Sequence, residues 1–378
     1  MNNTVYIILV IALALTLVGG IIFTVALAAA DWDFSNLDSG QYSTNSYNFD
    51  ELTSDITICV FRADVNILPS SDNSTRVVCY EKNKSKHEVT FEVGSLKIDA
   101  GSAPKWYENL FVFSKPKIDI YLPEEGVRSL MIVSDTGDVN VSGKFSFSYV
   151  TIGADTSDIS FAGSVEYQLK IEVCTGDVEI EDTVAGDAQI TVSTGDIDIE
   201  NLECKSLKTI GNTGDVEIEK LTASGTVDIE RSTGDVEMDI ASAGSLSVKT
   251  DTGDITLGNI TCADELGISV STGDTCISNS TTKSFTSTGD TGDLKMSNLV
   301  VENAMSIKRS TGDVKFERCD AAEVSITTDT GHVVGSFLSD KIIFASSNTG
   351  KIDVPKSTVG GKCEITTTTG KIIISICE

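Results

Sequence analysis

Hydrophobic and polar residues alternate in short segments over most of the chain after residue 130. In one such segment Val216 and Ile218 alternate with Glu217 and Glu219. A period of two residues places successive side chains on opposite faces of a β-strand, so these segments predict short, half-buried strands. No ten-residue window after Ala30 shows the 3.6-residue period of an amphipathic helix.

These segments belong to an internal repeat of 19 or 20 residues that contains the tripeptide Thr-Gly-Asp or a close variant. A unit of this length cannot bury its own apolar face, whereas stacked units share a continuous core. The repeat therefore predicts an all-β protein in which residues 131–378 form a parallel β-solenoid, or parallel β-helix, of about 12 rungs. Ser157 replaces one glycine; the others are Gly137, Gly176, Gly195, Gly214, Gly234, Gly253, Gly273, Gly292, Gly312, Gly331, Gly350 and Gly370.

An uncharged apolar segment runs from Val5 to Ala30. It is longer than the roughly 20 residues that cross a bilayer as a helix. A cleaved signal peptide is the alternative, because Ala28-Ala29-Ala30 offers a small-residue cleavage site. The length of the segment and the lack of a preceding Lys or Arg favour an uncleaved transmembrane signal anchor at residues 1–30.

The orientation of this anchor is only weakly encoded, because neither flank has a nearby Lys or Arg. Asp31, Asp33 and Asp38 follow the apolar segment, and a large domain lies beyond them. We therefore expect a single-pass protein of the cell membrane with an extracytoplasmic C-terminal domain.

Residues 31–130 lack the regular repeat. Residues 31–52 are predicted to be an irregular tether, and residues 53–130 an irregular β cap that covers the N-terminal end of the solenoid. No cap is expected at the other end, because the sequence stops within a rung after Ile372. Candidate strands of the cap lie at 56–61, 64–68, 76–81, 87–93, 95–99, 117–122 and 129–133.

Nine cysteines leave at least one unpaired or paired between chains. Cys59 and Cys79 lie in candidate strands and are the one pair considered for a disulfide, whose state the sequence leaves open. The repeat places Cys204 and Cys262 in an inward column with Ala223, Cys319 and Cys377 in one with Leu221, Cys363 in one with Val227, and Cys174 and Cys276 on outward positions.

Acidic residues dominate the charge of the chain. There are 56 acidic and 28 basic residues, a net charge of −28, and all of them follow the first 30 residues. A surface of this kind repels nucleic acid, which excludes nucleic-acid binding, and attracts divalent cations or basic peptides.

The aspartates of the repeat are expected to stack in a row at one corner of the solenoid, about 5 Å apart. This aspartate ladder has two interpretations: weak Ca²⁺ sites made of hard oxygen ligands, or aspartates that each close their own turn. We favour the second and predict no metal site, although calcium binding stays open. The ladder comprises Asp138, Asp158, Asp177, Asp196, Asp215, Asp235, Asp254, Asp274, Asp293 and Asp313, and continues with His332, Lys351 and Lys371.

A second row of carboxylates, the acidic strip, is predicted on the outward face. Such a row is usually a solvated surface that prevents aggregation. The alternative is a docking surface for a cationic envelope component or peptide, for which charge supplies attraction without specificity. The strip comprises Glu179, Glu181, Asp198, Glu200, Glu217, Glu219, Glu237 and Asp239.

Catalysis finds little support in the sequence. The two histidines, His87 and His332, are not near Cys or Ser in a nucleophile pattern. Parallel β-helices that cleave polysaccharides need long loops to form a groove, and here the rungs differ by a single residue. We therefore predict a protein that is not an enzyme and that has no catalytic residues and no cofactor.

Several segments together resemble one bacterial family of membrane-anchored envelope proteins, which carries the label "putative adhesin" and has no known function. They are the apolar anchor, the linker Asp33–Leu37, the segments Trp106–Glu108 and Ile120–Pro123, and the Thr-Gly-Asp-Val-x-Ile rungs. The resemblance covers nearly the whole chain. It implies a β-solenoid on the outer side of the membrane, and it identifies no functional residues.

Three functions remain in competition. We expect a non-catalytic, adhesin-like surface interaction or envelope-associated module. The alternative is a structural subunit that stacks end to end through its uncapped C-terminal rung, residues 370–378. A glycan-active enzyme is the least favoured. The sequence identifies neither the ligand nor the biological process.

Overall fold

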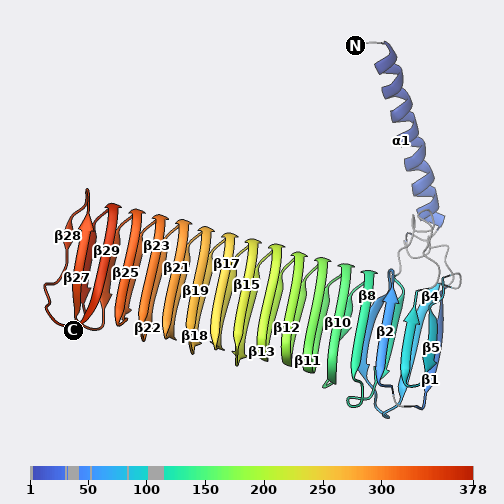
Figure 1. The fold of residues 1–378 in the computed structure, drawn as a ribbon. Coiled ribbons are helices and arrows are strands. Elements are labelled where there is room, and N and C mark those ends of the chain that lie inside the picture. The colour runs from blue at the N-terminus through green and yellow to red at the C-terminus, as the bar shows by residue number, and fades with distance from the viewer. Residues whose placement is uncertain are drawn as a thin grey trace.

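The protein is an all-β solenoid of about 12 turns preceded by a single helix (Figure 1). The computed structural model describes residues 3–29, 32, 42–51, 53–82, 85–100 and 115–377. The predicted linker Asp33–Leu37 and the segment Trp106–Glu108 lie outside these residues. The predicted fold class is therefore confirmed for the solenoid.

Two strands and two corners make up one rung of the solenoid. In the rung formed by β15 (Thr226–Thr233) and β16 (Val236–Ala243), Val227 and Ile229 point inward from the first strand. The next rung, β17 (Ser245–Thr252) and β18 (Ile255–Cys262), repeats the pattern in parallel register, with Val236 opposite Ile255. Alternation in sequence thus becomes columns of buried side chains.

Further rungs follow the same plan from residue 129 to residue 337. The first five strands of this stretch are β8 (Ser129–Thr136), β9 (Val139–Val141), β10 (Ser146–Thr156), β11 (Ile159–Thr175) and β12 (Val178–Thr194). The others are β13 (Ile197–Thr213), β14 (Val216–Ala223), β19 (Glu265–Thr272), β20 (Thr275–Thr282), β21 (Ser284–Thr291), β22 (Leu294–Val301), β23 (Ala304–Thr311), β24 (Val314–Cys319), β25 (Glu323–Thr330) and β26 (Val333–Phe337).

The Thr-Gly-Asp corner requires glycine for two reasons. Gly253 has φ +147°, a conformation that residues with a Cβ rarely adopt. A Cβ placed on it would also lie 2.0 Å from the carbonyl oxygen of Gly234 in the preceding rung. Because the backbones approach this closely, the corner fixes the register between successive rungs.

Eight successive rungs also bend within their second strand, at a residue in the left-handed conformation. Asn is favoured at such positions because its short polar side chain tolerates positive φ. The side-chain amide of Asn201 donates to Asp182, and that of Asn298 donates to Asn279, so these residues also bond between rungs. The residues at the bend are Asp182, Asn201, Lys220, Ile240, Asn259, Asn279, Asn298 and Arg318.

The N-terminal end begins with rungs that are out of sequence order. β2 (Asp55–Val60) and β3 (Asp64–Pro69) lie between β6 (Ser95–Asp99) with β7 (Lys117–Leu122) on one side and β8 with β9 on the other. All the strands predicted for the cap are confirmed. The parallel stacking nevertheless starts at residue 55, whereas the repeat placed the start of the solenoid at residue 131.

Three antiparallel strands complete the cap. β5 (Glu88–Glu92) pairs with β6, β4 (Thr75–Lys82) pairs with β7, and β1 (Tyr42–Phe49) pairs with β4. The prediction of an irregular tether through residue 52 is therefore wrong for residues 42–49. Its physical reason is that Tyr47 and Phe49 pack against the core.

The C-terminal end is also out of sequence order. β29 (Gly361–Thr369) lies between β25 and β27 (Lys341–Ser347), as Figure 1 shows. β30 (Ile372–Ile376) likewise lies between β26 and β28 (Ile352–Asp353). The expectation that residues 370–378 form the bare terminal rung is therefore wrong, because β27 and β28 cover that rung.

The helix α1 (Asn3–Ala29) stands apart from the solenoid (Figure 1). Its large apolar side chains between Val10 and Val25 are exposed. Among the residues whose side chains the structure describes, no helix has both the length and the hydropathy required to span a bilayer.

All nine cysteines are free. Cys59 and Cys79, whose pairing the sequence left open, are not bonded to each other, since β2 pairs with β6 and β8 while β4 pairs with β1 and β7. The inward columns of Cys204, Cys262, Cys319 and Cys363 are confirmed, as are the outward positions of Cys174 and Cys276. Cys377 does not share the column of Cys319, because a register shift after Phe316 puts Ile376 there instead.

We expect Ile240→Asn to stabilise the protein by about 1 kcal/mol. A β-branched side chain in the left-handed conformation is strained, and Asn relieves that strain. Ile240 has φ +54° and is 50% exposed, so little core packing is lost. Urea unfolding followed by circular dichroism measures the effect.

The matched control for Ile240→Asn is Val184→Asn, a similarly exposed residue (49%) that lies in a strand and has no positive φ. This control variant should not gain stability. An equal or greater gain for Val184→Asn would contradict the assignment of strain to position 240.

Candidate functional site

The aspartate ladder is held by hydrogen bonds between rungs. The backbone N–H of Asp235 donates to Oδ1 of Asp215 at 2.8 Å, and that of Asp254 donates to Oδ1 of Asp235 at 2.7 Å. The same bond recurs at every step from Asp138 to Asp313. Each carboxylate thus stabilises the corner of the following rung, whereas the sequence suggested that it closes its own turn.

The ladder begins one rung earlier than the sequence indicated. The N–H of Asp138 donates to Oδ1 of Asp64 at 3.1 Å, and the ammonium of Lys115 lies 3.7 Å from Asp64 and 3.4 Å from Asp138. Asp64 was not predicted from the repeat because Ala63 takes the place of the corner glycine. The tripeptide Arg62-Ala63-Asp64 could have identified this corner, because its aspartate stands where the Thr-Gly-Asp corners have theirs.

The far end of the ladder changes charge. The N–H of His332 donates to Oδ1 of Asp313 at 2.8 Å, and the N–H of Lys371 donates to Nδ1 of His332 at 3.1 Å. Lys351 follows in the outermost rung, which stacks on the rung of Lys371. The three predicted residues therefore extend the ladder, in the spatial order His332, Lys371, Lys351.

The ladder bonds give each aspartate from Asp138 to Asp293 a backbone partner in the following rung. Within the described part of the chain, no group of three or more His, Cys, Asp or Glu residues is arranged to hold an ion. The N–H of Asp293 lowers the pKa of Asp274, which stabilises the ionised form. The geometry therefore gives the ladder a structural role.

Two arginines that the repeat did not predict as buried lie beneath the ladder. Arg231 and Arg309 are each 3% exposed and stand on inward positions where the preceding rung has Gly and the following rung has Thr. Burial lowers the pKa of both guanidinium groups, while ladder aspartates act in the opposite direction. For Arg231 these are Asp196 and Asp215.

Each buried arginine occupies space that a glycine leaves open in the preceding rung. A Cβ on Gly211 would overlap Arg231, and a Cβ on Gly289 would overlap Arg309. Arg309 donates to Ser287 and Thr275, whereas Arg231 donates only to the carbonyl oxygen of Val192. In the sequence, a buried arginine could have been predicted where an inward glycine is followed one unit later by an arginine at the same position.

The acidic strip lies on the outer wall, as predicted. The register places Glu179, Asp198 and Glu217 opposite one another along one line, with Glu181 and Glu200 along a second. The charge of Glu179 is the main cause that raises the pKa of Glu181. Burial first, and then Glu217, raise the pKa of Asp198. Repulsion within the strip therefore opposes full ionisation.

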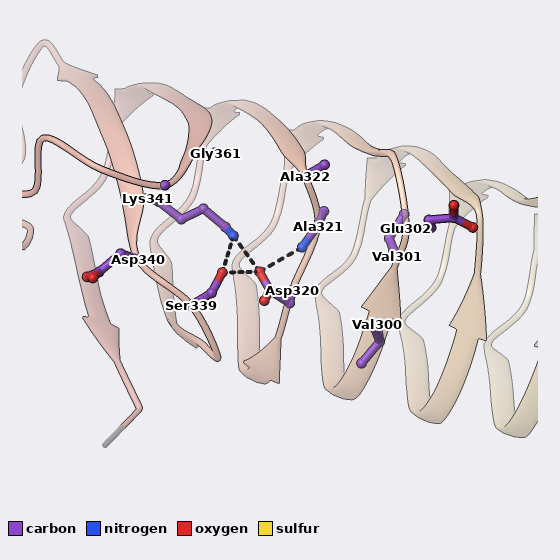
Figure 2. A pocket seen from close by; sticks show the side chains of 11 residues that line it. Val300, Val301, Glu302, Asp320, Ala321, Ala322, Ser339, Asp340, Lys341 and Gly361 are labelled. Carbon is purple, nitrogen blue, oxygen red and sulfur yellow. Dashed lines mark hydrogen bonds and ion pairs between the residues drawn. The ribbon is translucent and has the colours of Figure 1, made fainter.

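A hollow of about 570 Å³ lies near the C-terminal end (Figure 2). The ammonium of Lys341, almost fully buried, donates to Asp320 and to the hydroxyl of Ser339 at 2.7 Å. A serine beside a lysine can act as a nucleophile and its base. Here the nitrogen of Lys341 is held in an ion pair with Asp320, which accounts for the burial of this lysine.

The remaining nucleophile and base candidates are dispersed. His87 bonds to Glu81 at 2.8 Å in the cap, and His332 belongs to the ladder at the other end of the solenoid. Burial raises the pKa of the Cys204, Cys262 and Cys319 thiols to about 11, which leaves them protonated at neutral pH. The structure brings none of these residues into one site.

We expect thermal stability to rise as the pH falls from 7 towards 5, and to fall again below about 4. Glu181 and Asp198 have raised pKa values, so the folded state binds their protons first and gains stability as they are neutralised. Asp274 and Asp313 have lowered pKa values, so their contribution is lost as the pH falls through those values.

Circular dichroism melts over this pH range measure both effects. Added salt should reduce the part of the gain between pH 7 and 5 that comes from Glu181, because repulsion from Glu179 is the main cause of its raised pKa. It should leave much of the loss below pH 4, since that loss comes from hydrogen bonds. A melting temperature that falls steadily from pH 7 would contradict the assignment.

Comparisons with known proteins place the chain in a family. No relative was found among curated proteins. Crystal structures described as "putative adhesin" resemble it weakly. Those from Bacteroides fragilis, Parabacteroides distasonis and Parabacteroides merdae share 13%, 11% and 14% identity, with TM-scores of 0.33, 0.32 and 0.28. Each alignment covers 79% of this chain and 97%, 98% and 97% of the other chain, respectively.

Structural similarity at this level carries no argument about function. The match to a family model is stronger evidence of family membership, since it includes residues 53–262 and 242–378 and so covers the cap and the solenoid. It confirms the family resemblance drawn from the sequence. The chain belongs to the Toastrack DUF4097 family.

Proposed function

We propose that this protein is a non-catalytic, adhesin-like surface module that α1 anchors in the cell membrane with its solenoid outside the cytoplasm. The regularity of the wall is the observation that carries this proposal. From Ser146 to Phe337 the rungs follow one another with only short turns and small register shifts. Such a wall presents repeated, flat surfaces that suit binding to an extended partner.

The anchoring part of the proposal rests on α1. Its 27 residues, Asn3–Ala29, contain no charged side chain. At 1.5 Å per residue they extend about 40 Å, enough for a hydrocarbon core of about 30 Å. Apolar side chains from Val10 to Val25 that are exposed in water would be buried in lipid.

The acidic strip supports a second part of the proposal, a cationic partner such as a basic envelope component or peptide. The carboxylates of Glu179 and Glu181 repel each other, and this repulsion is the main cause that raises the pKa of Glu181. A bound cation would relieve this repulsion. The partner would then be attracted by charge along several rungs.

We expect the full chain to remain with membranes after a high-pH wash and to float with lipid vesicles. Leu15→Arg with Val18→Arg should release it, because each arginine near the bilayer centre costs about 2.5–3.5 kcal/mol. Leu15→Ile with Val18→Leu, which keeps the helix apolar, is the control. Protease added to intact cells should cleave the solenoid.

Release of the unchanged chain by the high-pH wash would contradict the anchoring proposal. Full protection of the solenoid from external protease, in cells that contain the chain, would contradict its extracytoplasmic placement. The two results are independent, so anchoring and orientation are tested separately.

Fluorescent oligolysine should bind the full chain at low salt, and binding should weaken by at least about tenfold as salt screens the strip. Glu179→Gln, Glu181→Gln and Glu200→Gln together should weaken it too, since they remove three charges. Glu51→Gln, Glu92→Gln and Glu323→Gln, which lie outside the strip, form a control of equal charge change. Equal weakening by both sets would contradict a role for the strip.

A further inference from the structure

The N-terminal end of the stack is stepped. On the side of β2 the stack continues outward with β6 and then β5, whereas on the side of β3 it continues with β7, β4 and then β1. The second side is therefore longer by one strand. Among the described residues β5 pairs with β6 alone and β1 with β4 alone, so both are edge strands at this end of the molecule (Figure 1).

The core is incompletely covered between these two edges. Tyr47 and Phe49 of β1 and Val89 and Phe91 of β5 pack against the core but remain partly exposed. The residues that pair with these four in β4 and β6 are at most 1% exposed. The rings of Phe49 and Phe91 stack with their centroids 4.8 Å apart, which joins the two sides at the open end.

The two edge strands differ in charge. β1 contains no charged residue and no proline, whereas β5 carries Glu88 and Glu92, both exposed. Charged side chains and proline are features by which proteins prevent edge-to-edge pairing, and like charges directly opposite each other destabilise a strand pair. The edge of β5 is therefore protected against another β5, but not against the uncharged β1.

The directions of the strands fit two copies of this end. β2 runs towards the corner at Ala63 and β3 runs away from it. β7 is parallel to β3, and two antiparallel pairings then separate it from β1, so β1 also runs away from the corner. β6 is parallel to β2 and antiparallel to β5, so β5 runs away from the corner as well.

A two-fold axis through this corner edge would place β1 of each copy beside β5 of the other, in parallel. Because one side of the step is longer by one strand, both sides of the stack would then become continuous across the two copies. The end is thus complementary to itself in both its shape and its strand directions.

Charge also favours contact through this end. Residues 42–130 contain ten basic and 13 acidic residues, whereas residues 131–378 contain 18 basic and 40 acidic residues. Repulsion between two copies is therefore smallest where their N-terminal ends meet. At the other end β28 has only two residues, and Pro355 and Lys356 follow it closely. These features count against the C-terminal stacking considered from the sequence.

We propose that the N-terminal end docks on a second copy of this chain, with β1 of each protomer paired in parallel with β5 of the other. The interface is isologous, because each copy offers the same two edges. Main-chain hydrogen bonds join the edges, and the four partly exposed apolar side chains are covered. Both β1 strands begin at the same corner edge, so both α1 helices can enter one membrane. Only this last point rests on the proposed anchoring.

The test measures the dimer dissociation constant of the full chain in detergent micelles by sedimentation velocity. Thr44 and Glu88 lie next to the corner edge, and Asn48 and Glu92 lie four residues further along their strands. Thr44→Glu with Asn48→Glu should therefore weaken the dimer by at least about tenfold, because each new carboxylate faces a glutamate of the other copy. Adding Glu88→Lys and Glu92→Lys to this variant should restore the dimer.

The same positions with the opposite charge provide a second comparison. Thr44→Lys with Asn48→Lys should leave the dimer as stable as before or make it tighter, because the lysines face Glu88 and Glu92. Equal weakening by the lysine and glutamate variants would indicate that two β1 strands pair with each other, and would overturn the proposed arrangement. A chain that stays monomeric at every concentration would overturn the proposal as a whole.

The matched control is Thr256→Glu with Thr261→Glu, two exposed positions of β18 in the middle of the solenoid. This control should dimerise as the unchanged chain does, and urea unfolding should show that all variants are folded. Equal weakening in the control would show that net charge alone opposes association, and would overturn the proposal.

Association through α1 is scored separately with Leu15→Arg and Val18→Arg. The dimer should persist in this variant, and a dimer that it abolishes while the changes in β1 leave it intact would overturn the proposal. If the high-pH wash releases the unchanged chain, the anchoring proposal fails. The same measurements without detergent then still decide whether the N-terminal ends pair.

Discussion

The close approach of successive backbones at the Thr-Gly-Asp corner is the constraint on which the rest of the structure depends. At Gly234 a Cβ would lie 2.0 Å from the carbonyl oxygen of Gly214, and Gly253 stands in the same relation to Gly234. A slip of one residue would put a side chain where none fits. It would also turn every apolar side chain outward, since strand faces alternate with a period of two. The corner thus selects the register, and the register assembles the core.

A stack of this kind has the weakness that its two ends lack a neighbour. Both ends solve the problem in the same way, by placing the rung nearest the chain terminus inside the stack. β2 and β3 are covered by β6 and β7, and β29 and β30 are covered by β27 and β28. Ile365 and Ile372 are in consequence fully buried, although they lie within 15 residues of Glu378. Fraying of the terminal strands then requires the covering rung to separate first.

The repeat in the sequence predicted the interior of the solenoid well and its ends poorly. Columns such as Cys204, Ala223, Ala243 and Cys262 follow from counting alone, because every unit has nearly the same length. Counting cannot decide the order of rungs with similar sequences. The units around Gly350 and Gly370 fit the stack in either order, and the choice depends on contacts between distant segments.

The polar residues that sequence reasoning missed share a different cause. Asp64 lies in a corner that lacks glycine, and Arg231 is a charged residue in an apolar column, so each departs from the pattern that defined the repeat. Burying an arginine is unfavourable unless opposite charges lie nearby. Asp196 and Asp215 supply those charges from the corner above it. The ladder that fixes the corners therefore also makes the buried arginines tolerable, which ties the two features to one electrostatic arrangement.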